Sequence, residues 1–207
     1  MMNICWEWPL RPICVILLLV YMAFQLHLLP KKLSKIVSKV FFYPTLPLTY
    51  WTRRHAYWTQ LDGKVIFGVA LLEPLQHVEM LHSKGVRAVV NLCDEYSGPL
   101  RKYDKLAIVQ LYLPTIDHCE PSLEDIQKAI AFIHEKTQAG AMVYIHCKSG
   151  NGRSAAVAFC WLLYAHKMTP VQAQMYLNDR RKVRKELYKQ PQIARFYREL
   201  MEKRDRS

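Results

Sequence analysis

One stretch near the middle of this 207-residue chain is compatible with few folds. Residues 142–145 (MVYI) are a short apolar run, residues 146–154 read HCKSGNGRS, and residues 155–165 are apolar and helix-forming. This order predicts a buried strand, a glycine-containing loop and a helix. A loop that leads into a helix N-terminus presents unpaired backbone N–H groups and the positive end of the helix dipole. We therefore expect an anion site, suited to phosphate, at 146–154.

Two side chains in this loop have the chemistry for a reaction at phosphorus. Cys147 opens the loop, where the N–H groups and the dipole favour the nucleophilic thiolate. Arg153 closes it, and its planar guanidinium can hold two phosphate oxygens at once. Ser154 is placed to donate a hydrogen bond to the sulfur. The remaining expected phosphate-binding residues are Lys148, Ser149, Gly150, Asn151 and Gly152, of which the two glycines allow the backbone to turn without a Cβ clash.

The alternative is that the spacing of Cys147 and Arg153 arose by chance. Cys147 would then be an ordinary buried cysteine, which usually packs as a small hydrophobic residue. The catalytic interpretation is favoured because all the elements of the motif follow a strand and precede a helix. His146 is expected either to hydrogen-bond the backbone near Cys147 or to be an ordinary buried histidine. HCKSGNGRS resembles the active-site signature of the cysteine-dependent protein tyrosine and dual-specificity phosphatase superfamily: His-Cys, five residues, Arg, then Ser or Thr.

Attack by a cysteine on a phosphomonoester also calls for an acid that protonates the leaving oxygen. Asp117 matches the general-acid position of that superfamily, on a loop after a predicted strand and 30 residues before Cys147. Asp94 is the alternative acid, and is otherwise expected to help hold the walls of the site. The resemblance implies a phosphocysteine intermediate, with no metal and no cofactor.

A second likeness concerns the substrate. Residues 41–48 (FFYPTLPL), Trp58, residues 65–68 and the run Asp94-Glu95-Tyr96 are similar to the mitochondrial members of this superfamily that dephosphorylate phosphatidylglycerophosphate. Lys148 resembles the residue after the cysteine in lipid-directed members, although Asn151 stands where phosphoinositide 3-phosphatases carry a second lysine. The implied substrate is an anionic phospholipid. A protein tyrosine or dual-specificity protein phosphatase, a phosphoinositide phosphatase and a non-catalytic phospho-binding module are the alternatives.

The remainder of the chain predicts an α/β fold with a central, mostly parallel sheet flanked by helices, as in dual-specificity phosphatases. Strands are expected at 65–69, 86–93, 108–113 and 142–145, and helices at 74–83, 123–136, 154–166, 170–182 and 191–203. The basic run 180–185 is expected to be a solvated helix end, with a contact to an acidic head group as the weaker interpretation.

The N-terminal region predicts an appendage to this domain. Residues 13–29 carry no charge and are long enough, at the short end of the range, for a membrane-spanning anchor helix. A cleaved signal peptide, a helix buried in the domain and a mitochondrial targeting sequence are the alternatives. The expected units are an anchor with a basic flank at 1–40, an extended aromatic linker at 41–61, and the phosphatase domain at 62–207.

Charge indicates the partner of this region. The net charge is +12, and no acidic residue lies between Glu7 and Asp62. Basic residues after the apolar run favour an anionic membrane face with the domain on the cytosolic or matrix side, in the mitochondrial inner membrane or a bacterial inner membrane. No motif for nucleic acid accompanies the charge, so no such partner is expected. The six cysteines show neither disulfide nor zinc spacing and indicate a reducing compartment.

Overall fold

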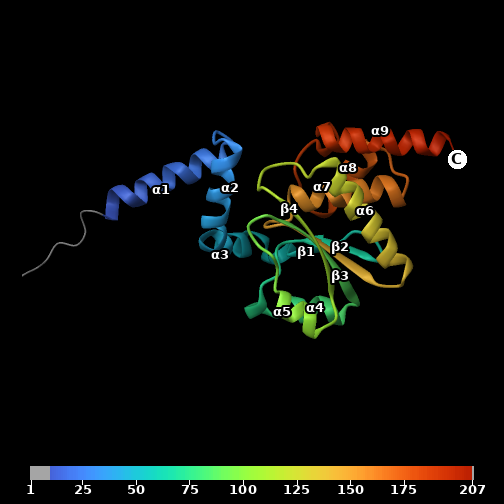
Figure 1. Cartoon of the computed structure of the whole chain (residues 1–207), viewed down its shortest axis with the longest axis horizontal. Helices are drawn as coiled ribbons and strands as arrows, with labels where there is room; N and C mark the ends of the chain where they lie inside the picture. The colour runs from blue at the N-terminus through green and yellow to red at the C-terminus, as the bar shows by residue number, and fades with distance from the viewer. Residues whose placement is uncertain (1–9, 207) are drawn as a thin grey trace, which may run out of the picture.

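The structure is a computed structural model and describes residues 10–206. A five-stranded sheet with helices on both faces forms the body of the molecule (Figure 1). The strands lie in the order β1 (Trp58–Gln60), β2 (Val65–Gly68), β5 (Met142–His146), β3 (Val86–Cys93) and β4 (Val109–Thr115). Only β1 is antiparallel to its neighbour among these strands, so the predicted α/β fold with a mostly parallel sheet is confirmed. β1 has three residues, too few to show an alternating pattern.

The longer helices agree with the sequence prediction within a few residues: α6 (Leu123–Gln138), α7 (Arg153–Ala165), α8 (Pro170–Arg180) and α9 (Pro191–Asp205). The helix expected at 74–83 begins later, as α4 (His77–Ser83), because Gln76 adopts the left-handed conformation with a φ of 54°. α5 (Leu100–Lys105) was not predicted, since six residues give less than two turns of apolar periodicity.

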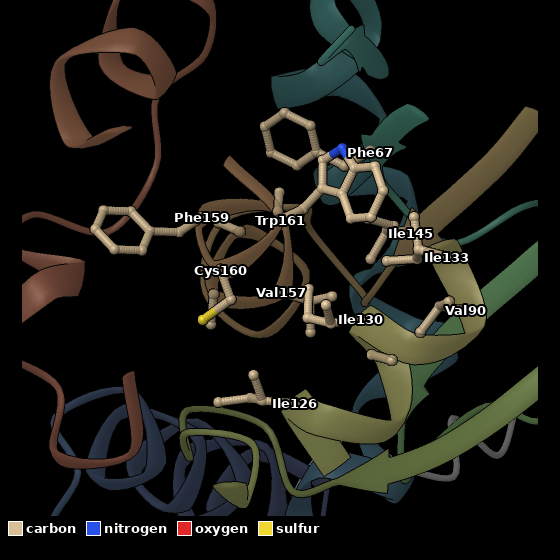
Figure 2. Close-up of a cluster of buried hydrophobic side chains, with 14 of the residues drawn as sticks. Phe67, Val90, Ile126, Ile130, Ile133, Ile145, Val157, Phe159, Cys160 and Trp161 are labelled. Carbon is tan, nitrogen blue, oxygen red and sulfur yellow. The ribbon is translucent and has the colours of Figure 1, made fainter. Parts of the chain in front are cut away.

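The main core surrounds α7. Every residue of this helix from Arg153 to Leu163 is buried. Figure 2 shows Val157 of α7 beside Ile130 of α6, and Trp161 of α7 beside Phe67 of the sheet, while Phe159 points to the opposite side of the helix. Each fully buried large apolar side chain stabilises the fold by about 1.5–3 kcal/mol. The core therefore fixes the start of α7, where the predicted phosphate-binding loop (residues 146–154, called the phosphate loop below) ends.

Three helices precede the sheet: α1 (Leu10–Gln25), α2 (Lys31–Val40) and α3 (Phe42–Arg53). Residues 1–9 of the predicted N-terminal unit lie outside the described part of the chain. From residue 10 to residue 206, none of the helices combines the length and the apolar character needed to cross a membrane. The spanning helix expected over 13–29 is thus not found, because α1 ends at Gln25 and the chain then turns through His27, whose φ is 59°.

The expectation of an extended linker at 41–61 is wrong for most of its length, since α3 occupies it. Pro47 lies inside this helix, where a proline costs about 3 kcal/mol relative to alanine. Burial offsets that cost. Phe42 and Leu46, one helical turn apart, are buried against Ala70, and the Phe42 ring stacks on Tyr96 with centroids 5.1 Å apart. The segment is therefore a helix that packs on the domain.

Candidate active site

The candidate residues meet at one edge of the sheet. β5 lies between β2 and β3, and β4 is the next strand, all four parallel. Cys147 directly follows β5, Glu95 comes two residues after β3, and Asp117 comes two residues after β4. Because the carboxyl ends of parallel strands open at the same edge, segments far apart in the sequence converge there. The predicted strand, loop and helix are all present, with α7 beginning at Arg153.

Cys147 lies buried at the base of the loop. Its Sγ is 3.2 Å from Oγ of Ser154, in the first turn of α7. Burial alone would raise the pKa of the Cys147 thiol, but the nearby Arg153 guanidinium and the hydrogen bonds from Ser154 outweigh it, so this pKa lies below its usual value. The site therefore favours the thiolate, as a nucleophilic cysteine requires.

Arg153 is buried and linked to three segments. Nη1 and Nη2 donate a bidentate pair of hydrogen bonds to Glu95, at 2.8 and 2.7 Å, and Nη2 also donates to Oδ1 of Asp117 at 2.7 Å. Nη1 further donates to the carbonyl oxygens of Leu92 and Thr115. Nε is buried without a hydrogen-bond partner among the described residues, so this donor is available to a substrate oxygen.

Asp117 accepts hydrogen bonds from Arg153 and from the backbone of its own loop. Oδ1 also accepts the backbone N–H of His118 at 3.0 Å, and 22% of the side chain is exposed. Burial opposes ionisation, but Arg153 and other cations lower the pKa of Asp117 below its usual value. A phosphate bound to Arg153 would compete for the same guanidinium, and its negative charge would raise the pKa of Asp117. Substrate binding would thereby favour the protonated form that an acid needs.

Glu95 is the residue that sequence reasoning missed. The prediction assigned Asp94 to the walls of the site, whereas Asp94 forms ion pairs with Lys35 and Lys39 of α2, at 3.3 and 3.5 Å. Both carboxylates follow β3, and neighbouring side chains there point in different directions, so only one of them meets Arg153. The Asp94-Glu95 pair after a strand was the available signal, but it did not show which member faces inward.

The loop conformation depends on Gly150 and on Arg181. Gly150 has a φ of 69°, and a Cβ there would lie 2.7 Å from the backbone carbon of Gly68. Gly152 has no such requirement, since its φ is −110° and a Cβ would make only ordinary contacts. Arg181 donates to the carbonyl oxygens of Ser149, Gly150 and Ala56. These bonds fix the carbonyl groups of Ser149 and Gly150 in the loop.

The prediction of a solvated basic run at 180–185 is therefore wrong for two of its residues. Arg181 is only 3% exposed beneath the loop. Arg184 is half-buried, its backbone N–H donates to the Asn151 carbonyl at 2.9 Å, and its Nη2 donates to the His118 carbonyl at 3.2 Å. Arg184 thus connects the phosphate loop to the Asp117 loop.

Lys148 and His146 flank Cys147 in the sequence and have different surroundings. Lys148 lines the cavity above Cys147, and its Nζ donates to Oγ1 of Thr45 in α3 at 2.6 Å. His146 is buried, with both ring nitrogens lacking a hydrogen-bond partner among residues 10–206. Burial lowers the pKa of His146 to about 3, although the Cys147 backbone opposes this shift in part. The ring is therefore neutral, as in an ordinary buried histidine.

A cavity of about 230 Å³ opens above Cys147. The loop residues Lys148, Ser149, Asn151, Gly152 and Arg153 line it together with Asp117, His118 and Arg184. Its remaining wall comes from α1 and α3, through Tyr21, Gln25, Thr45, Leu48 and Thr49. A larger cavity of about 720 Å³, bordered by Asp62, Trp161 and Lys203, contains none of the candidate residues. In the part of the chain that the structure describes, no group of three or more His, Cys, Asp or Glu side chains is placed to hold a metal ion.

Comparison with known proteins identifies the family. Residues 72–205 match the family "dual specificity phosphatase, catalytic domain". The human phosphatidylglycerophosphatase and protein-tyrosine phosphatase 1 is 31% identical over 149 residues, which cover 66% of this chain and 74% of the relative. The Arabidopsis thaliana phosphatidylglycerophosphate phosphatase PTPMT1 is 30% identical, over 69% of this chain and 44% of the relative. A crystal structure of PTPMT1 superposes with a TM-score of 0.64 at 23% identity, covering 73% of this chain and all of that one. This chain belongs to the dual specificity phosphatase family and is a cysteine-dependent phosphatase that hydrolyses phosphoric monoesters.

Proposed function

We propose that Cys147 attacks the phosphorus of a phosphomonoester and that Arg153 binds its oxygens. The thiolate forms the sulfur–phosphorus bond while the bond to the leaving oxygen breaks, which gives a phosphocysteine. The lowered pKa of Cys147 and the unpartnered Nε of Arg153 support these roles. Water then attacks the phosphocysteine, releases inorganic phosphate and regenerates the thiolate.

Asp117 is the proposed acid of the first step and the base of the second. It would protonate the leaving oxygen as the alcohol departs and then accept a proton from the attacking water. Its place beside Arg153 at the mouth of the cavity supports this assignment. Asp94 is the less suitable candidate, because it is engaged by Lys35 and Lys39 on the α2 side.

The proposed substrate is a phospholipid phosphomonoester, and phosphatidylglycerophosphate is the best single candidate, with phosphatidylglycerol as the product. The observation that carries this proposal is the composition of the cavity wall. Lys148 and Arg184 add positive charge beyond Arg153, which suits the second, diester phosphate of this lipid, and Tyr21 and Leu48 add apolar surface. The names of the human and Arabidopsis relatives support the same substrate. A mitochondrial or bacterial inner membrane is the proposed location.

Phosphotyrosine in a protein is the second candidate, since the same cysteine, arginine and acid would serve it. The name of the human relative includes protein-tyrosine phosphatase, which favours keeping this alternative. A phosphoinositide would also bring additional negative charge to Lys148 and Arg184. The three substrates differ in charge and in the presence of acyl chains.

A substrate panel tests the proposal. The purified chain is given phosphatidylglycerophosphate in detergent micelles, a phosphatidylinositol phosphate in the same micelles, and a phosphotyrosine peptide, with phosphate release as the readout. We expect kcat/KM for phosphatidylglycerophosphate to exceed the other two by about tenfold or more, as one well-placed charge contact of about 1.4 kcal/mol would give. Cys147→Ser should release no phosphate from any of them. Preference for the peptide would make the protein-phosphatase alternative correct.

A further inference from the structure

The N-terminal helix α1 exposes an unusual amount of apolar surface. Figure 1 shows α1 projecting from the body of the molecule and joined to it near its C-terminal end. Seven of its apolar side chains are between 45% and 62% exposed: Ile13, Val15, Ile16, Leu17, Leu18, Leu19 and Met22. Four or more consecutive positions cover all sides of a helix, so this surface is apolar all round. A continuous exposed apolar surface of this kind marks an interaction site.

The charge next to α1 indicates what covers it. Lys31 and Lys32 begin α2 and are exposed, and they lie only six residues beyond the end of α1. α2 also exposes Leu33, Ile36 and Val40, each next to one of its lysines in the sequence. An apolar helix followed by a basic amphipathic one suits an anionic lipid surface, which offers hydrocarbon to the first and negative head groups to the second.

Two protein partners fit less well. A groove on another protein would cover one side of α1, whereas lipid can surround it. A second copy of this chain would likewise cover only one side of α1. If the two helices packed in parallel about a two-fold axis, the same lysines of both copies would also come together, and like charges oppose such association.

Two of the three N-terminal helices, α1 and α3, also line the cavity. Tyr21 and Gln25 of α1 and Leu48 of α3 line it, and Phe24 packs edge-on against the His118 ring with centroids 4.8 Å apart. α2 is held by Asp94, and Thr45 of α3 by Lys148. The helix that carries the exposed apolar surface therefore also lines the cavity, through Tyr21 and Gln25 near its C-terminal end.

We infer that α1 and α2 form a lipid-docking surface, in which α1 is buried in an anionic membrane and Lys31 and Lys32 lie among its head groups. Its link to catalysis rests on the proposed function: a lipid held beside α1 would present its phosphate to the cavity through Tyr21 and Leu48. The docking itself is independent of the identity of the substrate.

Vesicle flotation of the full-length chain without substrate tests this inference. The vesicles are either phosphatidylcholine alone or equal parts of phosphatidylcholine and phosphatidylglycerol. The double variant Leu17→Asp, Leu18→Asp should lose binding to both by about tenfold or more, because two buried leucines are replaced by charges. Lys31→Glu with Lys32→Glu should lose about tenfold or more on the anionic vesicles only. Wild type should bind the anionic vesicles more tightly than the neutral ones.

The matched control is Val171→Asp with Met175→Asp, two side chains of α8 that are each 60% exposed and one helical turn apart. This variant should bind vesicles within about twofold of wild type, since single exposed apolar residues carry little energy. All variants should hydrolyse nitrophenyl phosphate at the wild-type rate, which separates loss of docking from loss of phosphatase chemistry.

Three results would overturn the inference. The α1 variant would float like wild type if α1 does not enter lipid. Equal binding of wild type to both vesicles would remove the role of charge. A lipid-free wild-type dimer that dissociates in the α1 variant, measured by sedimentation, would make a second copy the occupant. If the chain docks as expected but does not hydrolyse phosphatidylglycerophosphate, only the proposed substrate fails.

Discussion

At the residue scale, the site depends on how charge is balanced around Arg153. A buried guanidinium is stable only when paired, and Glu95 supplies a bidentate partner that is itself fully buried. Asp117 is a second partner through a single oxygen. On the proposed mechanism, we expect a substrate phosphate to replace Asp117 while Glu95 keeps the arginine in place.

The proposed acid role of Asp117 predicts that the effect of removing its carboxylate on the rate depends on the leaving group. Asp117→Asn should lower kcat/KM for an alkyl phosphate by about 100-fold or more, the usual contribution of a general acid, because an alkoxide needs a proton as it leaves. Nitrophenyl phosphate should slow by less than about tenfold, since nitrophenolate leaves without one. Wild-type rates should fall as pH rises above the pKa of Asp117 in the substrate complex, and this fall should disappear in the variant.

Asp94→Asn is the control for that measurement. It removes a carboxylate that pairs with Lys35 and Lys39 of α2. Its rates on both substrates should stay close to wild type. A leaving-group effect in Asp94→Asn, and none in Asp117→Asn, would transfer the acid role to Asp94.

At the element scale, the parallel strands position the charged and nucleophilic residues of the site, and the N-terminal helices form part of the cavity wall. β3, β4 and β5 deliver Glu95, Asp117 and Cys147 to one edge of the sheet. α3 closes the opposite wall, and its position depends on one fully buried aromatic ring, Phe42. The N-terminal helices are thus part of the site, although they lie before residue 72, where the family match begins.

The packing of α3 predicts that alanine substitutions at two adjacent residues lower the free energy of unfolding by very different amounts. Phe42→Ala should lower the free energy of unfolding by about 3 kcal/mol or more, because it leaves a cavity against Ala70 and Tyr96. Tyr43→Ala should cost less than about 1 kcal/mol, since Tyr43 is exposed. Chemical denaturation with linear extrapolation measures both. Equal costs would mean that α3 does not pack on the domain in solution.

At the scale of the whole molecule, the free energy of unfolding should depend on pH, because buried titratable side chains have shifted pKa values in the folded state. The folded state keeps His146 neutral, with its pKa lowered to about 3, while the unfolded chain has an ordinary histidine. As pH falls below about 6.5, the unfolded chain gains a proton that the folded chain does not bind, so stability decreases. Asp62 and Asp117, whose pKa values are also lowered in the folded state, add to this loss at lower pH.

His146 alone should reduce the free energy of unfolding by about 2 kcal/mol between about pH 7 and pH 5. His146→Gln should remove that part of the pH dependence, whatever its effect on stability at pH 7. His55→Gln, at an exposed histidine, should keep the wild-type pH dependence. Urea denaturation of all three proteins at the two pH values measures the difference, and an unchanged slope in His146→Gln would contradict the explanation.

Local features of this protein could be read from the sequence because they depend on neighbouring residues. The apolar run at 142–145, the loop at 146–154 and the helix after it are contiguous, so their order predicted Cys147 and Arg153 together. The alternation of strands and helices predicted the α/β class for the same reason. Asp117 depended on family resemblance, since a carboxylate on a loop has no local signal of its own.

Only the tertiary structure decided the contacts between distant segments. Arg153 pairs with Glu95 and not with Asp94. Lys148 donates to Thr45, and Arg181 donates to a carbonyl oxygen of the phosphate loop. The tertiary structure also made α3 a helix despite Pro47, because burial of Phe42 outweighs the local preference. Each outcome is set by burial and pairing energies between groups far apart in the sequence, which local propensity and spacing do not contain.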